Sequence, residues 1–86
     1  MTVHFLPDED GSAEVKVAYA VGRKVGTAVV RNRCRRRLRA IAFELTPELA
    51  AGAYLVTVGA EGASLGFQEL KERVSETMRT ASRAGR

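Results

Sequence analysis

Residues 28 to 45 carry the pattern that most restricts the fold, because their apolar side chains recur with the period of a helix. At about 100° per residue, these side chains fall within a stripe about 80° wide. They are Val30, Cys34, Leu38, Ile41 and Leu45. Thr27 can cap the start of the helix. Thr46 and Pro47 are expected to end it, because proline disfavours helical geometry in the preceding residue. The pattern predicts a helix from about Ala28 to Leu45 that docks its apolar face on the rest of the fold.

Charge is segregated along the chain in the same region. Between Val15 and Phe43 there is no Asp or Glu, so all 10 acidic residues lie elsewhere, with only five of the 14 basic ones. The nine basic residues of this segment are Lys16, Arg23, Lys24, Arg31, Arg33, Arg35, Arg36, Arg37 and Arg39. Segregation of this kind implies a polyanionic partner that is met on one surface. Arginine pairs its planar fork with phosphate and stacks on bases, which favours nucleic acid.

Length and composition set the class of protein. The 86 residues suffice for a single domain spanning residues 1–86. No apolar run approaches the roughly 18 residues of a membrane span. The first residues lack the basic and apolar regions of a secretory signal, and a single cysteine fits a reducing compartment. We therefore expect a cytoplasmic protein without a membrane partner.

Two strands are predicted before the helix. Thr2–Leu6 reads as a short strand, and Pro7–Ser12 as a turn. Glu14–Val21 alternates apolar and other side chains, which is typical of a strand. The two strands are expected to pair as a hairpin. Gly22 and Gly26 bracket a loop that leads into the helix.

One strand and one helix are predicted after the basic helix. Ala53–Val58 is almost continuously β-favouring, as expected for a strand that is covered on both faces. Ser64 is expected to cap a last helix, whose shared apolar face holds Phe67, Leu70, Val74, Met78 and Ala81. The tail from Ser82 to Arg86 is expected to fray. The order strand, strand, helix, strand, helix predicts an α+β fold with helices packed on a small sheet.

Catalysis by side chains has little support. The only histidine is His4 and the only cysteine is Cys34, on different predicted elements. Two such ligands do not make a closed zinc site, and Cys34 lies in the apolar stripe, which favours a buried structural thiol. The acidic turn at residues 8–10 could bind a cation, but a solvated turn is the simpler interpretation. A free-standing nuclease would need carboxylate pairs for metal that the pattern does not supply. We expect no catalytic and no metal-ligating residue.

The arginine run itself is the candidate binding site. Six arginines within nine residues repel each other unless an anion is present, and no acidic partner follows at helical spacing before Glu44. The glycine-bracketed loop places two more cations just before a helix N-terminus, which is good anion-binding geometry. Asn32 could form a hydrogen bond with a base or a 2′-hydroxyl. No preceding helix and tight turn complete a helix-turn-helix, so DNA is not expected. The candidate RNA contacts are Arg23, Lys24, Arg31, Asn32, Arg33, Arg35, Arg36, Arg37 and Arg39.

Residues 21–39 resemble the signature of the bacterial ribonuclease P protein component. The Arg-Asn-Arg core at residues 31–33, followed by paired basic residues, Leu38 and Arg39, carries the resemblance, and the order of elements over residues 2–81 fits it. The resemblance implies an endoribonuclease holoenzyme that removes the 5′ leader from precursor tRNA. It also implies that a catalytic RNA subunit holds the reaction centre and most of the magnesium ions.

The same resemblance implies how the protein subunit works. It binds the RNA subunit through the Arg-Asn-Arg helix, holds the leader in a cleft over the sheet, and has a left-handed strand–helix–strand crossover. Family members usually begin with a further helix that supplies aromatic residues to this cleft, whereas this sequence starts at a strand. The alternative function is that of a small structural RNA-binding protein of the ribosomal type.

Overall fold

The computed structural model describes residues 1–7 and 14–84. Most of the turn predicted over Pro7–Ser12 and the last two residues of the tail lie outside that range. The central helix, α1, spans Ala28–Leu45 as predicted, and the Thr27 hydroxyl accepts a 3.4 Å hydrogen bond from the N–H of Val30 at its start. A short 3₁₀ turn, η2 (Thr46–Glu48), carries proline in its first turn and follows the helix directly. Local capping and proline chemistry therefore set both ends of α1.

Three strands form one sheet in the order β1-β3-β2. The strands are β1 (Thr2–Pro7), β2 (Val15–Val21) and β3 (Gly52–Val58). β3 is antiparallel to β1 and parallel to β2. The predicted hairpin between the first two strands is therefore wrong, because β3 lies between them. β3 supplies the most deeply buried row of the sheet, Tyr54, Val56 and Val58, and the central position places this row under both long helices.

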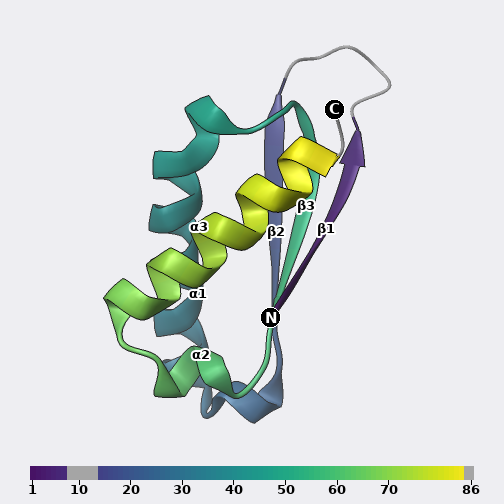
Figure 1. Ribbon diagram of the computed structural model, residues 1–86. Coiled ribbons are helices and arrows are strands. Elements are labelled where there is room, and N and C mark those ends of the chain that lie inside the picture. Colours follow the sequence, from purple (N-terminus) through teal and green to yellow (C-terminus); the bar gives the residue numbers. More distant parts are fainter. Residues whose placement is uncertain (8–13, 85–86) are drawn as a thin grey trace.

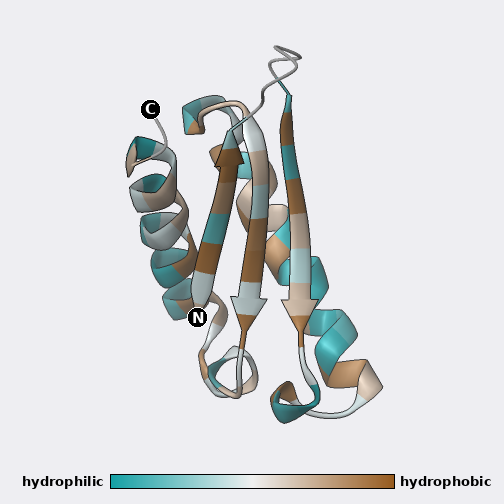
Figure 2. Cartoon of the chain, turned by 90° about the vertical axis from the view of Figure 1, so that its right-hand side faces the viewer, coloured by the Kyte–Doolittle hydropathy of each residue, from teal (hydrophilic) through white to brown (hydrophobic). Residues whose placement is uncertain are grey.

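The connection from β2 through α1 to β3 is a left-handed crossover (Figures 1 and 2). When the sheet is viewed from its helix side with β2 and β3 pointing upward, β3 lies to the left of β2. Parallel strands joined through a helix almost always cross over with the opposite hand. The handedness implied by the family resemblance is thus confirmed.

Both long helices cover the same face of the sheet (Figure 2). Along β3, alternate residues are buried, while Ala53, Leu55 and Thr57 are exposed on the other face. The prediction that this strand is covered on both faces is wrong for the described residues. Its outward side chains are small or apolar, so the sequence lacks the polar residues that usually mark an exposed face of a strand.

The last predicted helix is divided in the structure. Residues Glu61–Ser64 form a short helix, α2, and α3 spans Phe67–Ala84. Ser64 does not cap α3, because its hydroxyl donates a 3.3 Å hydrogen bond to the carbonyl of Glu61 within α2. Leu70, Val74 and Met78 of α3 are buried as predicted, whereas Phe67 is 44% exposed. The predicted face therefore holds only from the second turn onward.

Tyr54 is the largest buried side chain of the core and connects its layers. The ring packs at 4.7 Å from the ring of Phe5 on β1, and the hydroxyl donates a 2.6 Å hydrogen bond to the carbonyl of Ala50. Leu38 and Ile41 of α1 and Leu70 of α3 belong to the same cluster. α1 therefore packs against the core along its apolar stripe, and its opposite side is exposed to solvent. In the described part of the chain, no helix is long and apolar enough to cross a membrane.

Candidate nucleic-acid interface

The outer side of α1 presents the predicted basic face. Asn32, Arg33, Arg36 and Arg39 are exposed, and Arg31, Arg35 and Arg37 are half-buried at its margins. The opposite side is buried at Cys34, Leu38, Ile41 and Leu45, with Val30 half-buried against the core. The helical period therefore predicted both faces of α1 correctly. We call the seven charged or amide residues from Arg31 to Arg39 the basic face.

Arg23 and Lys24 lie in a 3₁₀ turn, η1 (Arg23–Val25), immediately before α1. Both side chains are exposed, while Val25 is buried and anchors the turn. Gly26 closes the turn with a positive φ of 143° and donates a 3.1 Å hydrogen bond from its N–H to the carbonyl of Arg23. A backbone of this kind favours glycine. The turn thus presents two cations beside the N-terminal end of the basic face.

No arginine of this region has an acidic partner within residues 1–7 and 14–84. The side-chain ion pairs there join Lys71 to Glu44 at 2.9 Å, Arg79 to Glu48 at 3.1 Å and, more loosely, Lys16 to Glu14 at 3.8 Å. Closely spaced like charges on one helix face are destabilising unless an anion offsets them. The charge of the basic face is therefore available to an external polyanion.

Asn32 has a local role that the sequence pattern did not indicate. Nη1 of Arg35 donates a 3.1 Å hydrogen bond to Oδ1 of Asn32. The side-chain carbonyl of Asn32 therefore already accepts one hydrogen bond, and both hydrogens of its amide NH₂ stay available to a partner molecule. The same contact orients the guanidinium of Arg35 along the helix surface.

Arg39 also acts on a residue that sequence reasoning did not single out. Tyr19 of β2 is half-buried, and this burial raises the pKa of its hydroxyl, while the nearby positive charge of Arg39 opposes the rise. The C-terminal part of the basic face therefore lies on the side of α1 near β2, against which α1 packs.

Cys34 and His4 are not brought together. Cys34 is 2% exposed in the core, and burial raises the pKa of its thiol against the opposing charges of Arg37 and Arg35. His4 is exposed on the open face of the sheet. Residues 1–7 and 14–84 contain no group of three His, Cys, Asp or Glu side chains able to hold a metal ion.

The open face of the sheet is a second exposed surface. In register across the strands, His4 of β1, Leu55 of β3 and Ala18 of β2 form one row, and Leu6, Ala53 and Lys16 form the next. Leu6 is 70% exposed and Leu55 is 40% exposed. Reasoning from the residues missed this surface, since only the pairing of the strands shows that these side chains share a face.

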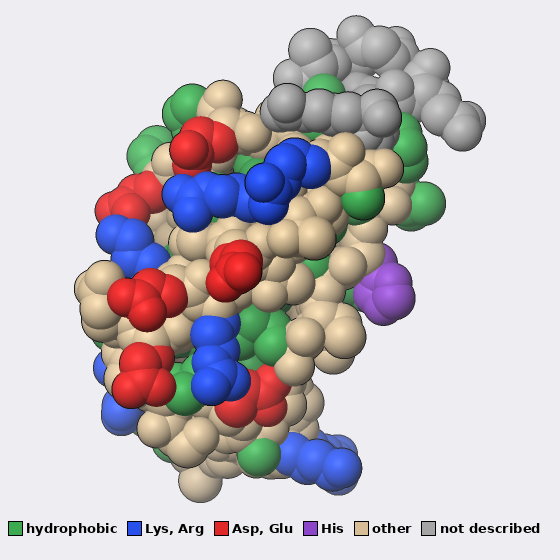
Figure 3. Space-filling view, in the orientation of Figure 1, with side chains coloured by type: hydrophobic (Ala, Val, Ile, Leu, Met, Phe, Trp, Pro, Cys, Tyr) green, Lys and Arg blue, Asp and Glu red, His purple; other side chains and the backbone are tan. Residues whose placement is uncertain are grey.

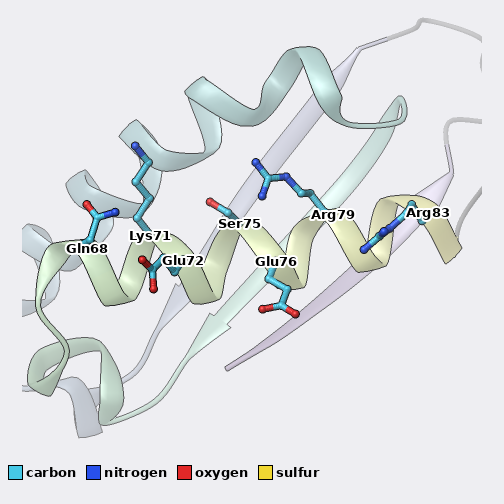
Figure 4. Close-up of a pocket in the computed structure, with 7 residues that line it drawn as sticks. All are labelled: Gln68, Lys71, Glu72, Ser75, Glu76, Arg79 and Arg83. Atoms are coloured by element: carbon cyan, nitrogen blue, oxygen red, sulfur yellow. The ribbon is translucent and has the colours of Figure 1, made fainter.

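The groove along α3 is a different kind of surface (Figures 3 and 4). The groove is lined by Gln68, Lys71, Glu72, Ser75, Glu76, Arg79 and Arg83. Acidic and basic side chains alternate across this face (Figure 3), and Lys71 extends toward α1 (Figure 4), where it meets Glu44. Because its charges compensate each other, this groove offers a polyanion little attraction.

Comparison with known proteins relates the chain to one family. A family model described as Ribonuclease P matches residues 1–82. The ribonuclease P protein component of Symbiobacterium thermophilum is 40% identical over 80 residues, which covers 92% of this chain and 69% of that protein. The one of Thermobifida fusca is 37% identical over 79 residues, covering 90% of this chain and 54% of that protein.

Solved structures give the same fold. The RNase P protein of Staphylococcus aureus superposes with a TM-score of 0.82 at 16% identity, over 92% of this chain and 72% of the other. The RNase P protein from Thermotoga maritima superposes with a TM-score of 0.74 at 19% identity, over 91% and 83% of the two chains. The chain therefore has the fold of these two solved structures.

Proposed function

Because this chain belongs to the family of ribonuclease P protein components, we propose that its basic face binds the RNA subunit of that enzyme and assists removal of the 5′ leader from precursor tRNA. The single observation that carries this proposal is the row of arginines on α1, which have no acidic partner among residues 1–7 and 14–84. Such a row neutralises closely spaced phosphates and gains affinity by releasing counterions. The cations of η1 extend the contact at the N-terminal end of the helix.

In this proposal the chemistry belongs to the RNA subunit. Magnesium would activate the attacking water and stabilise the leaving oxygen there. In the described part of this chain, no group of three His, Cys, Asp or Glu side chains could hold a metal ion, and the proposal places the ions on the RNA. The side chains of the protein instead lower the repulsion between the phosphates of two RNA molecules.

We assign the leader to the open face of the sheet. Single-stranded nucleic acid follows exposed cations with its backbone, and its bases can lose water-exposed area against apolar side chains without stacking on them. Leu6 and Leu55 provide apolar contacts on this face, and Lys16 provides a cation at the β2 edge. The leader would therefore lie on the side of the sheet opposite the helices.

The small ribosomal-type protein remains the rival function from another class. A ribosomal-type protein would also bind RNA through the basic face, but adding it would not change cleavage of the leader. The two functions are separated by a cleavage assay at low magnesium concentration, using the cognate RNA subunit with and without this chain. We expect the chain to restore cleavage that the RNA alone performs poorly under these conditions.

Two double variants make that assay specific. Arg36→Ala with Arg39→Ala removes two charges from the basic face, and we expect it to abolish most of the stimulation. Arg73→Ala with Arg83→Ala removes two exposed charges from α3 and should leave stimulation close to that of the unmodified chain. Equal losses in both double variants would mean that net charge, not the basic face, is responsible, and the proposal would fail.

A further inference from the structure

Phe43 is an exposed aromatic ring on the same side of α1 as the arginines. Its side chain is 81% exposed, more than any other large hydrophobic side chain that the structure describes. Arg39 and Arg36 precede it by four and seven residues, spacings that place all three on one side of a helix. Two helical turns separate Phe43 from Arg36, a rise of about 10 Å. An apolar ring therefore continues the line of the basic face at its C-terminal end.

These residues surround a shallow hollow of about 500 Å³. The hollow is lined by Arg36, Arg39, Ala40, Phe43 and Glu44. Ala40 also lines the hollow, and its small side chain fills little of the space beside the ring and the two guanidinium groups. Within the described residues, neither arginine has an ion-pair partner. The hollow thus combines an aromatic surface with two uncompensated positive charges.

Glu44 would oppose an anion at this place, but it is held by another element. Its carboxylate pairs with Nζ of Lys71 on α3 at 2.9 Å. The pairing offsets its negative charge and directs it toward α3. The electrostatic character of the hollow is therefore set by Arg36 and Arg39.

We infer that Phe43, Arg36 and Arg39 form a stacking site for one unpaired nucleotide of the RNA subunit. The base would stack on the ring of Phe43, and the adjoining phosphates would pair with the two guanidinium groups. Unpaired bases of RNA stack on aromatic side chains, whereas paired bases in an RNA helix are not accessible in this way. An apolar protein partner fits less well, because it would bury two unpaired charges. This inference rests on the proposed function of the basic face.

The test is a titration of the RNA subunit with the full chain and variants at position 43. Alanine substitution of a residue that stacks on one base typically costs about 5- to 150-fold in affinity. We expect Phe43→Ala to lose affinity in this range and Phe43→Trp to retain it. Phe43→Leu should lose nearly as much as Phe43→Ala, because leucine is apolar but cannot stack. Phe67→Ala, which removes an exposed ring at the start of α3, serves as the matched control and should bind normally.

The salt dependence separates this inference from the function on which it rests. Phe43→Ala removes no cation, so the slope of log affinity against log salt concentration should stay unchanged, whereas Arg36→Ala should lower the slope by about one. If Arg36→Ala weakens binding and Phe43→Ala does not, the stacking site is wrong and the proposed function stands. If neither variant has an effect, the proposed function itself fails. Normal affinity of Phe43→Leu, or an effect of Phe43→Ala on self-association alone, would also overturn the stacking site.

A spectroscopic readout tests stacking directly. The chain contains no tryptophan, so Phe43→Trp introduces a single indole fluorophore at the hollow. Stacking of a base on the indole should quench its fluorescence when the RNA subunit is added. Phe67→Trp provides the same fluorophore outside the hollow, and its emission should change little. Equal responses at the two positions would contradict a stacking site at position 43.

Discussion

The side-chain hydroxyl oxygen of Ser82 on α3 accepts a 2.7 Å hydrogen bond from the backbone N–H of Ala50, 32 residues earlier in the chain. The carbonyl oxygen of the same Ala50 accepts a hydrogen bond from the hydroxyl of Tyr54. Ser82 is 2% exposed, and Ala50 is half-buried. The segment that carries the chain from α1 into β3 is therefore held by the last helix and by the core together.

We expect Ser82→Ala to lower the free energy of unfolding by about 1 kcal/mol, because the N–H of the half-buried Ala50 would lose its hydrogen-bond partner. Denaturant unfolding measures this change. Ser64→Ala, at an exposed serine of α2, is the control and should stay within about 0.5 kcal/mol of the unmodified chain. Equal stability of both variants would mean that the contact to Ala50 contributes nothing.

Gly52→Ala should destabilise the sheet. Gly52 has a φ of +148°, and an added Cβ would lie 2.5 Å from the carbonyl oxygen of Leu6 and 2.7 Å from the ring of Phe5. Relief requires a shift of β1 or β3, and we expect a loss of about 2 kcal/mol or more in the free energy of unfolding. Gly22→Ala meets no atom within 4 Å and should be tolerated. Thermal unfolding of the two variants compares them directly.

The salt dependence of RNA-subunit binding should report the number of phosphates on the basic face. With about six to eight phosphates engaged, the slope of log affinity against log salt concentration should lie near −5 to −7. Binding titrations over a range of potassium chloride concentrations give this slope. A slope shallower than about −2 would show that the arginines of α1 are not the main contact.

Asn32→Ala should weaken holoenzyme function and leave the salt slope unchanged, because no cation is lost. Two effects act together: the amide donor of Asn32 disappears, and Arg35 loses its 3.1 Å hydrogen bond. Asn32→Asp keeps an acceptor for Arg35 but adds a negative charge among the arginines, so it should weaken binding more than Asn32→Ala and make the salt slope shallower. Titration of the RNA subunit and cleavage at low magnesium provide the readouts; if Asn32→Ala is silent in both, the directed contact does not exist.

The thiol of Cys34 should react slowly in the folded protein, because it is buried and its pKa is raised by burial. We expect modification by a thiol reagent at neutral pH to proceed only as fast as the protein opens, and to become rapid in denaturant. Cys34→Ser should cost about 1–3 kcal/mol of stability, since a hydroxyl is buried without an assured partner. Its cleavage rate in the assembled holoenzyme should be normal. Rapid modification of the native protein would contradict the buried position.

The basic face could be predicted from the sequence because it depends on one helix alone. The period of α1 separates residues such as Leu38, buried in the structure, from residues such as Arg36, exposed in it. Thr27 and Pro47 act on the ends of the same helix through local backbone chemistry. The hollow at Phe43 lies within that helix as well, but its significance depends on Glu44 being held by Lys71 of α3.

The sheet could not be predicted in the same way. The alternation of apolar and other side chains along Val15–Val21 identifies a strand. Which strand pairs with it depends on which one buries its apolar side chains best under α1 and α3. β3 takes that place, separates β1 from β2, and exposes Leu55 beside His4.

By itself, the sequence determined the elements with a strong local signal: α1, its two faces, its caps and the charge that it carries. Tertiary structure alone decided the order of the strands, the open face of the sheet and the contact of Ser82 with Ala50. The physical reason is range. Helical period, capping and charge spacing act within a few residues, whereas pairing and burial are settled among segments that are distant along the chain and compete for the same core.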